Sequence, residues 1–201
     1  MKKIYLVRHG ETIENKNNIM IGNSTEKGIG NLTEKGIEQA TLLSEYLKSF
    51  SIDLIYSSTL KRAVDTAKII NKRIKTNIVL NTYLDERDLG DLIGITREGF
   101  EKIWSKQKNK VDFKPGGGES YLDILKRVKL FLDHLKSIKE EHILVVSHGR
   151  FIKILLNYVN NKSLLNKVKQ DNCCINIIIY NNVFKVQSIN HKRYVYKFFC
   201  G

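Results

Sequence analysis

The sequence predicts an α/β fold, a three-layer α/β/α sandwich with a mostly parallel central sheet. Short apolar stretches of strand type alternate with longer stretches that place apolar residues at helical spacing. This alternation is typical of a sheet covered by helices on both faces. The chain has 201 residues, the size of one domain, and no repeat, low-complexity tract or Ser/Gly-rich linker divides it. We therefore expect a single domain over residues 1–201.

The first half of the chain predicts three strands and two helices around a long loop. The strands are expected at 4–7, 53–56 and 78–80, and the helices at 34–50 and 60–71. Thr33 is expected to cap the first helix, and the hydroxyls of Ser57, Ser58 and Thr59 the second. The apolar face of the first helix is predicted to comprise Ile37, Ala40, Leu43 and Leu47. Residues 14–31 are rich in Asn and Gly and predict a long loop of the kind that often serves function.

The second half predicts helices separated by one strong break. A helix is expected over 96–108, and the Pro-Gly-Gly-Gly run within 114–118 ends this region. Ser120 with Asp123 three residues later predicts the start of a long helix, and another helix is expected over 151–159. The long helix should bury Leu122, Leu125, Val128, Leu132 and Leu135. The remaining strands are expected at 143–146, 175–180, 183–189 and 194–199.

The chain is strongly basic, with 34 Lys and Arg residues against 21 Asp and Glu and a formal net charge of +13. A basic surface can attract nucleic acid, lipid or phosphorylated metabolites. The lysines are spread along the chain, however, and neither an Arg/Lys cluster with interleaved aromatics nor a nucleic-acid-binding motif is present. We therefore expect a solvated lysine surface and no nucleic-acid partner.

Hydropathy and cysteine usage bear on the location of the protein and on the role of its cysteines. No apolar run is long enough to span a bilayer, and the apolar start is too short for a signal peptide, so we expect a cytoplasmic protein without membrane contact. The three cysteines show no CxxC spacing, which argues against a disulfide framework or a zinc site. The adjacent Cys173 and Cys174 are expected to be buried packing residues.

Two predicted strands end in His-Gly, at Arg8-His9-Gly10 and at Ser147-His148-Gly149. If both strands are parallel neighbours, their carboxyl ends bring His9 and His148 to one sheet edge, the edge where α/β proteins bind ligands. Arg8 and Arg62 would lie beside them, the latter in the first turn of a helix. The alternatives without a binding site are a basic turn after an edge strand and a solvated arginine on a helix face.

Two imidazoles beside two guanidiniums make a poor metal site, because the cations repel a metal ion. They suit a phosphate dianion instead, since Arg offers paired donors to its oxygens. An unprotonated imidazole can attack phosphorus, and a carboxylic acid can protonate the leaving oxygen. The acid-rich loop over 84–91 could supply that carboxyl group, although such acids are more often solvated or cap helices. The residues thus predict phosphoryl transfer through a phosphohistidine. No Walker P-loop is present, which argues against a nucleotide-driven kinase.

Six motifs occur in a familiar order, and with them the chain resembles the histidine phosphatase superfamily, in the branch of cofactor-dependent phosphoglycerate mutases and fructose-2,6-bisphosphatase-type phosphatases. The motifs span most of the chain up to about Leu156. They are Leu6-Val7-Arg8-His9-Gly10-Glu11-Thr12 with Asn15, Leu32-Thr33 through Gly36 with Gln39-Ala40, Ser57-Ser58-Thr59-Leu60-Lys61-Arg62-Ala63 with Thr66-Ala67, Leu84-Asp85-Glu86 to Gly90, Pro115 through Gly118-Glu119-Ser120, and Val146-Ser147-His148-Gly149.

The resemblance implies a phosphoglycerate mutase-like fold and a role for each site residue. His9 would be the phosphorylated nucleophile, and Glu86 the acid that protonates the leaving group, because the family's glutamate lies four residues before a glycine, here Gly90. The phosphoryl group would be bound by Arg8, Asn15, Arg62 and His148. The family needs no metal, and we expect no cofactor. The 14–31 loop and the 90–118 segment would form a cap over the site.

The reaction expected is hydrolysis of a small phosphomonoester metabolite by a metal-independent phosphatase. Phosphoglycerate mutase is the alternative, because mutases also have arginine after the acidic residue, as in Glu86-Arg87. The short stretch between Gly94 and Pro115 and the Pro-Gly-Gly-Gly-Glu-Ser run favour a phosphatase. Leu92-Ile93-Gly94 stands where many relatives have Trp-Glu-Gly, so the substrate cannot be copied from them. A non-catalytic phospho-ligand binder is a third hypothesis, and both monomer and homodimer stay open.

Overall fold

The computed structural model describes residues 1–192, and the strand expected at 194–199 lies outside them. A six-stranded sheet forms the centre, with the order β3-β2-β4-β1-β5-β6. The pairs β3–β2, β2–β4 and β4–β1 are parallel, whereas β5 and β6 are antiparallel to their neighbours. The mostly parallel sheet is therefore confirmed. Its strands are β1 (Lys2–Arg8), β2 (Leu54–Ser57), β3 (Asn77–Leu80), β4 (His142–Ser147), β5 (Ile175–Asn181) and β6 (Val183–His191).

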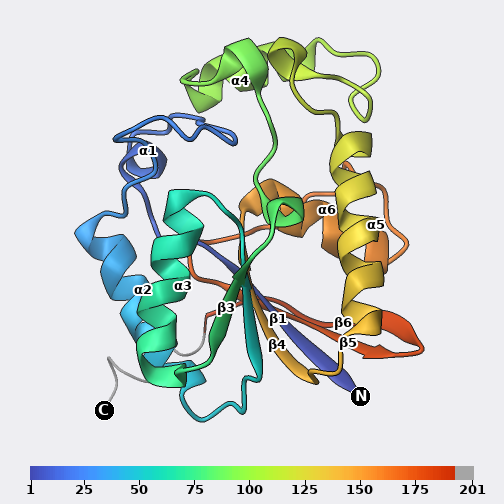
Figure 1. Ribbon diagram of the computed structural model, residues 1–201. Coiled ribbons are helices and arrows are strands. Elements are labelled where there is room, and N and C mark those ends of the chain that lie inside the picture. Colours follow the sequence, from blue (N-terminus) through green and yellow to red (C-terminus); the bar gives the residue numbers. More distant parts are fainter. Residues whose placement is uncertain (193–201) are drawn as a thin grey trace.

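Helices cover both faces of the sheet, which confirms the three-layer α/β/α architecture. Figure 1 shows α2 and α3 together on one side and α5 and α6 on the other. Successive residues of β1 and β4 point to opposite faces, as strand geometry requires. Ile4 and Val145 thus pack in the core under α5 and α6, and Tyr5 and Val146 in the core under α2 and α3. The helices are α1 (Ile13–Lys16), α2 (Glu34–Leu47), α3 (Lys61–Ile74), α4 (Arg97–Ser105), α5 (Tyr121–Ser137) and α6 (Gly149–Val159).

The structure corrects the expected start of α3. The helix begins at Lys61 and its N-cap, Leu60, has no side-chain cap. The hydroxyls of Ser58 and Thr59 donate instead to the carboxylate of Asp85, at 2.6 and 2.8 Å. The helix starts one residue later than expected, so both hydroxyls lie before its N-cap, where Oγ of Ser58 also accepts from the N–H of Leu60 at 3.1 Å.

Three further expectations about local structure were wrong. A short helix, α1, overlaps the start of the predicted loop because Thr12 and Asn15 form a capping box. The helix α4 ends at Ser105 and does not reach residue 108. Ile37 and Leu122 were expected in the core but are 48% and 40% exposed, since each lies at the margin of its helix's apolar stripe.

The pairing of β1 with β4 positions the candidate site. Arg8 lies opposite Ser147 in this parallel register, so His9 and His148 follow at adjacent strand ends. Ile19, in the loop after α1, and Thr96, directly before α4, form an isolated bridge. Figure 1 shows that this loop and α4 lie beyond the carboxyl ends of these strands. The sheet thus supplies one wall of a pocket and the two joined segments lie over it.

The expectations about the adjacent cysteines and about membrane-spanning helices can also be compared with the structure. Cys173 and Cys174 are both fully buried, which confirms their assignment as packing residues. Within residues 1–192, no helix is both long enough and apolar enough to cross a membrane.

Candidate active site

A pocket of about 390 Å³ opens at the carboxyl ends of β1 and β4. The structure brings five of the six predicted site residues to its lining, namely Arg8, His9, Asn15, Arg62 and Glu86. The sixth, His148, is fully buried behind the lining, and its ring centroid lies 5.1 Å from that of His9. Residues from five separate stretches of chain therefore converge on one cavity.

His9 follows β1 and is 3% exposed. Its Nδ1 atom lies 2.8 Å from the carbonyl oxygen of Gly10. A carbonyl can only accept, so Nδ1 carries the proton and Nε2 keeps its lone pair. Burial first, and then the charges of Arg62 and Arg8, hold the pKa of His9 well below its ordinary value of 6.5. The imidazole is therefore neutral at neutral pH, the state in which it is a nucleophile.

Two guanidinium groups flank this imidazole and are fixed by backbone carbonyls. Arg8 donates from Nη1 to the carbonyl oxygen of Gln170 at 2.7 Å, and Arg62 donates from Nη2 to that of Gly22 at 2.6 Å. Burial lowers the pKa of Arg62 to about 10, which still leaves it a cation at neutral pH. The buried Nε atom of Arg8 has no hydrogen-bond partner within residues 1–192. Two fixed cations beside a neutral imidazole can hold an anionic phosphoryl group in line with Nε2.

His148 belongs to a chain of hydrogen bonds that ends in a carboxylate. Its Nδ1 accepts from Nε of Arg62 at 3.2 Å, so the neutral ring carries its proton on Nε2, which lies 2.8 Å from the hydroxyl of Ser58. That hydroxyl in turn donates to Asp85. Burial and the charge of Arg62 keep the pKa of His148 well below its ordinary value. Because both ring nitrogens have protein partners here, direct phosphate binding by His148 stays a prediction.

Of the four carboxylates in the acid-rich loop, Glu86 lines the pocket. Its carboxylate accepts from the backbone N–H of Arg87 at 2.9 Å and from that of Arg150, in the first turn of α6, at 3.3 Å. The other three acids are placed elsewhere: Asp85 binds Ser58 and Thr59, Asp88 accepts from the N–H of Gly90, and Asp91 is exposed.

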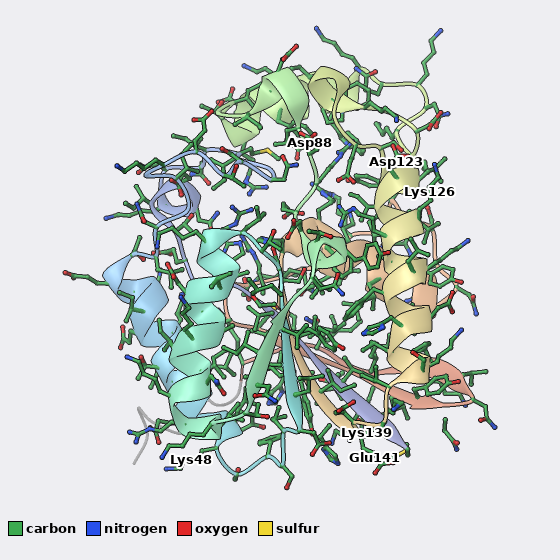
Figure 2. All side chains as sticks on the ribbon, viewed as in Figure 1. Lys48, Asp88, Asp123, Lys126, Lys139 and Glu141 are labelled. Atoms are coloured by element: carbon green, nitrogen blue, oxygen red, sulfur yellow. The ribbon has the colours of Figure 1, made fainter. Side chains whose placement is uncertain are left out.

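The labelled residues of Figure 2 help to locate the end of the molecule at which the pocket lies. Asp88 lies below α4, at the end of the sheet that carries the pocket, whereas Lys48, Lys139 and Glu141 lie at the opposite end.

Sequence reasoning missed a positioning segment between α6 and β5. The side-chain amide of Asn172 donates to the carbonyl oxygen of His9 at 3.0 Å and to Oδ1 of Asn15 at 3.1 Å. Oδ1 of Asn15 also lies 3.5 Å from Nη2 of Arg8. Asn172 thus connects His9 with Asn15, and Gln170 anchors Arg8. No motif marks this segment, and its role became visible when the fold brought it to the end of β1.

Six further cations line the pocket, and the sequence analysis assigned none of them to the site, although it noted Arg87 beside Glu86. Arg87 directly follows Glu86 and Arg150 comes two positions after His148, which was a usable signal. The others lie on α4, on α6 or between α6 and β5. The six cations are Arg87, Arg97, Arg150, Lys153, Lys167 and Lys169.

The sequence matches the family description "histidine phosphatase superfamily (branch 1)" over residues 4–191. The 2,3-bisphosphoglycerate-dependent phosphoglycerate mutase of Parvibaculum lavamentivorans is 29% identical over 177 residues, which cover 80% of each chain. The mycobacterial glucosyl-3-phosphoglycerate phosphatase superposes with a TM-score of 0.82 and 25% identity, covering 96% of this chain and 100% of the other. The α-ribazole phosphatase of Shigella flexneri superposes with a TM-score of 0.79 and 25% identity, covering 94% and 96%.

Proposed function

The chain belongs to the histidine phosphatase superfamily (branch 1), and we propose that it is a phosphatase that hydrolyses a small phosphomonoester metabolite through a phosphohistidine on His9. The observation that carries the proposal is the state of His9: a neutral ring with its proton on Nδ1, a free Nε2, and the guanidiniums of Arg8 and Arg62 beside it. This combination suits attack on a bound phosphoryl group.

In the first half of the reaction, Nε2 of His9 attacks phosphorus while the bond from phosphorus to the ester oxygen breaks. Arg8 and Arg62, with Asn15, bind the non-bridging oxygens and offset their charge. The carboxylic acid of Glu86 gives its proton to the departing oxygen, which leaves as an alcohol. The products of this step are the free alcohol, phosphorylated His9 and the Glu86 carboxylate.

In the second half, the Glu86 carboxylate takes a proton from water, and the resulting hydroxide attacks the phosphohistidine. The bond from phosphorus to Nε2 breaks and its electron pair returns to the ring. Inorganic phosphate departs, and both His9 and Glu86 regain their starting states. His148 keeps Arg62 in place through Nδ1. No step requires a metal ion, since the arginines supply the positive charge.

We also propose that the 14–31 and 90–118 segments act as a cap over the bound substrate. The support is their mutual pairing: the N–H of Met20 donates to the carbonyl of Ile95 at 2.9 Å, and that of Gly94 to the carbonyl of Met20 at 2.8 Å. Ile19 from the first segment and Arg97 from the second both line the pocket. A paired cap of this kind excludes water from the phosphoryl group before attack.

Phosphoglycerate mutase is the second candidate function, favoured by Arg87 directly after Glu86 and by the mutase relative. A panel of phosphorylated metabolites, assayed in EDTA with and without 2,3-bisphosphoglycerate, separates the two. We expect release of inorganic phosphate that does not depend on 2,3-bisphosphoglycerate. Isomerisation of a phosphoglycerate that depends on this compound would assign the mutase reaction instead. Binding of a phosphorylated ligand without either reaction would assign a non-catalytic binder.

A further inference from the structure

The segment that carries Glu86 has little regular structure of its own. Residues 85–89 belong to no helix or strand and connect two short 3-10 helices, Thr82–Leu84 and Gly90–Leu92. A carboxyl group that gives its proton to a leaving oxygen has to lie within hydrogen-bond distance of that oxygen. The position of Glu86 therefore depends on contacts between this segment and other parts of the chain.

Arg127 of α5 holds the segment on the N-terminal side of Glu86. Its Nη1 atom donates to the carbonyl oxygens of Tyr83 and Asp85, at 2.6 and 3.1 Å. Its guanidinium carbon also lies 5.8 Å from the ring centroid of Phe151, a fully buried residue of α6. Arg127 thus joins the backbone before Glu86 to both α5 and α6.

Glu119, two residues before α5, holds the segment on the C-terminal side of Glu86. Its Oε2 atom accepts from the N–H of Asp88 at 3.1 Å, and its own backbone N–H donates to the carbonyl oxygen of Asp88 at 3.0 Å. Its carbonyl oxygen accepts from Nε of Arg87 at 2.7 Å. In Figure 2, Asp88 lies at the level of Asp123, in the first turn of α5. The two residues that follow Glu86 are therefore both bonded to Glu119.

Glycines let the backbone before Glu119 approach the acid-rich loop closely. A Cβ atom at Gly118 would lie 2.5 Å from the carbonyl oxygen of Asp88, and one at Gly90 would overlap the carbonyl group of Gly116. Neither position can carry a larger side chain unless the backbone moves. The Pro-Gly-Gly-Gly run thus packs directly against the loop.

Glu119 and Arg127 also bind each other. Nε and Nη2 of Arg127 donate to Oε1 and Oε2 of Glu119, both at 2.8 Å. The two side chains are 18% and 24% exposed, so water has little access to the pair. Two parallel charge-assisted hydrogen bonds fix the relative orientation of both groups. One ion pair therefore holds the chain on both sides of Glu86.

We propose that Glu119 and Arg127 are positioning residues, which hold the carboxyl group of Glu86 toward the leaving oxygen of the substrate. The assignment rests on the proposed function, in which Glu86 is the general acid. Neither residue of the pair lines the pocket, so each acts through Glu86. A displacement of a catalytic group by about 1 Å can slow a reaction about a hundredfold.

The test compares kcat/KM for propyl phosphate and p-nitrophenyl phosphate. The alkyl leaving group needs the proton of the acid, whereas p-nitrophenolate departs without it. In Arg127→Met we expect the value for propyl phosphate to fall by about tenfold or more and that for p-nitrophenyl phosphate by less than about threefold. An equal fall for both esters would overturn the proposal, because a loss of folded protein or of phosphate binding affects both alike.

A second variant carries the test if Arg127→Met does not fold, as judged by circular dichroism. Glu119→Gln keeps the size of the side chain and removes the charge that orients Arg127. It should lower the ratio of the propyl value to the p-nitrophenyl value by about threefold or more. An unchanged ratio in folded Glu119→Gln would contradict the role of the pair.

Two control variants change the protein without touching the loop. Arg73→Met removes an arginine whose ion pair, with Glu45, joins α3 to α2. Leu135→Val weakens the packing of a buried residue in the last turn of α5, at the opposite end from Glu119. Both should leave the ratio of the two kcat/KM values unchanged. A fall in either control equal to that in Arg127→Met would overturn the assignment.

A double-mutant cycle shows whether Arg127 acts through Glu86. In the Glu86→Gln background, Arg127→Met should lower kcat/KM for propyl phosphate by less than about threefold, because no acidic proton is left to be positioned. The same loss in both backgrounds would mean that Arg127 acts independently of Glu86, and the assignment would be wrong.

Hydrolysis by the parent chain tests the proposed function separately. Hydrolysis of both esters, with equal losses for the two esters in the Arg127 and Glu119 variants, would reject the positioning pair and leave the phosphatase proposal standing. Hydrolysis of neither ester by the parent chain would overturn the phosphatase proposal and, with it, the role assigned to the pair.

Discussion

Nδ1 of His9 lies 2.8 Å from the carbonyl oxygen of Gly10, and this contact determines which ring nitrogen can act as a nucleophile. The carbonyl is itself held in place, because the N–H of Gly10 donates to the hydroxyl of Thr66 at 3.0 Å. A Cβ atom at Gly10 would also lie 2.6 Å from the carbonyl oxygen of Gly36, so a glycine is needed at this position. The loop after β1 thus fixes the tautomer of His9 through a backbone carbonyl, and the hydroxyl of Thr66 anchors the same loop.

Glu86 is the second residue on which the proposed chemistry depends. Glu86→Gln removes the transferable proton, so kcat/KM for an alkyl phosphate should fall by about a hundredfold or more. The loss with p-nitrophenyl phosphate should be much smaller, because that leaving group departs without protonation. Asp91→Asn, an exposed acid of the same loop, is the control and should leave both values unchanged. An equal loss with both esters would show that another group is the acid.

The two buried histidines make stability depend on pH. The pKa values of His9 and His148 both lie well below 6.5 in the folded protein, so the unfolded chain binds more protons under acidic conditions. The free energy of unfolding is therefore highest above pH 6.5 and should fall as the pH drops below it, by about 1 kcal/mol per pH unit for each histidine.

Urea unfolding between about pH 7.5 and 5.5 measures this effect. In His148→Gln the fall in unfolding free energy should be about half as steep as in the parent chain. His142→Gln, at the opposite end of β4, controls for the loss of a histidine outside the pocket. A parent chain whose stability does not change over this range would contradict the neutral state assigned to both buried rings.

A close backbone contact outside the pocket predicts an effect on the free energy of unfolding. A Cβ atom at Gly36, in the first turn of α2, would lie 2.1 Å from the carbonyl oxygen of Glu11. Gly36→Ala should therefore lower the free energy of unfolding by about 3 kcal/mol, since backbone cannot move aside cheaply. Gly149→Ala is the matched control in the first turn of α6, where the nearest atom is 3.5 Å away, and should change stability by less than about 1 kcal/mol. Equal effects would mean that α2 is not held against this loop.

The sequence was sufficient to predict which residues the strand ends bring together. Arg8-His9 and His148 follow apolar strands, and a parallel sheet has to bring such ends to one edge once β1 and β4 pair. The geometry of Glu86 agrees with its selection from four nearby acids, because it is the acid of that loop that lines the pocket.

The remaining features depend on contacts between residues far apart in the chain. The hydroxyl of Ser58 donates to the carboxylate of Asp85, which is 27 positions away, and no local pattern indicates this partner. Asn172 reaches His9 across 163 positions, and no local pattern marks it. The antiparallel pairing of β5 with β1 and the contacts of Arg127 with the acid-rich loop arise in the same way, from tertiary packing.

The central claim is that His9 carries the phosphoryl group during turnover. Intact-mass analysis of protein mixed with p-nitrophenyl phosphate and quenched in alkali, which preserves phosphohistidine, tests it most directly. We expect a mass gain of one phosphoryl group that maps to His9, and neither this gain nor hydrolysis in His9→Ala, while His142→Ala behaves as the parent chain does. Continued turnover by His9→Ala, or a phosphoryl group on a different residue, would contradict the account.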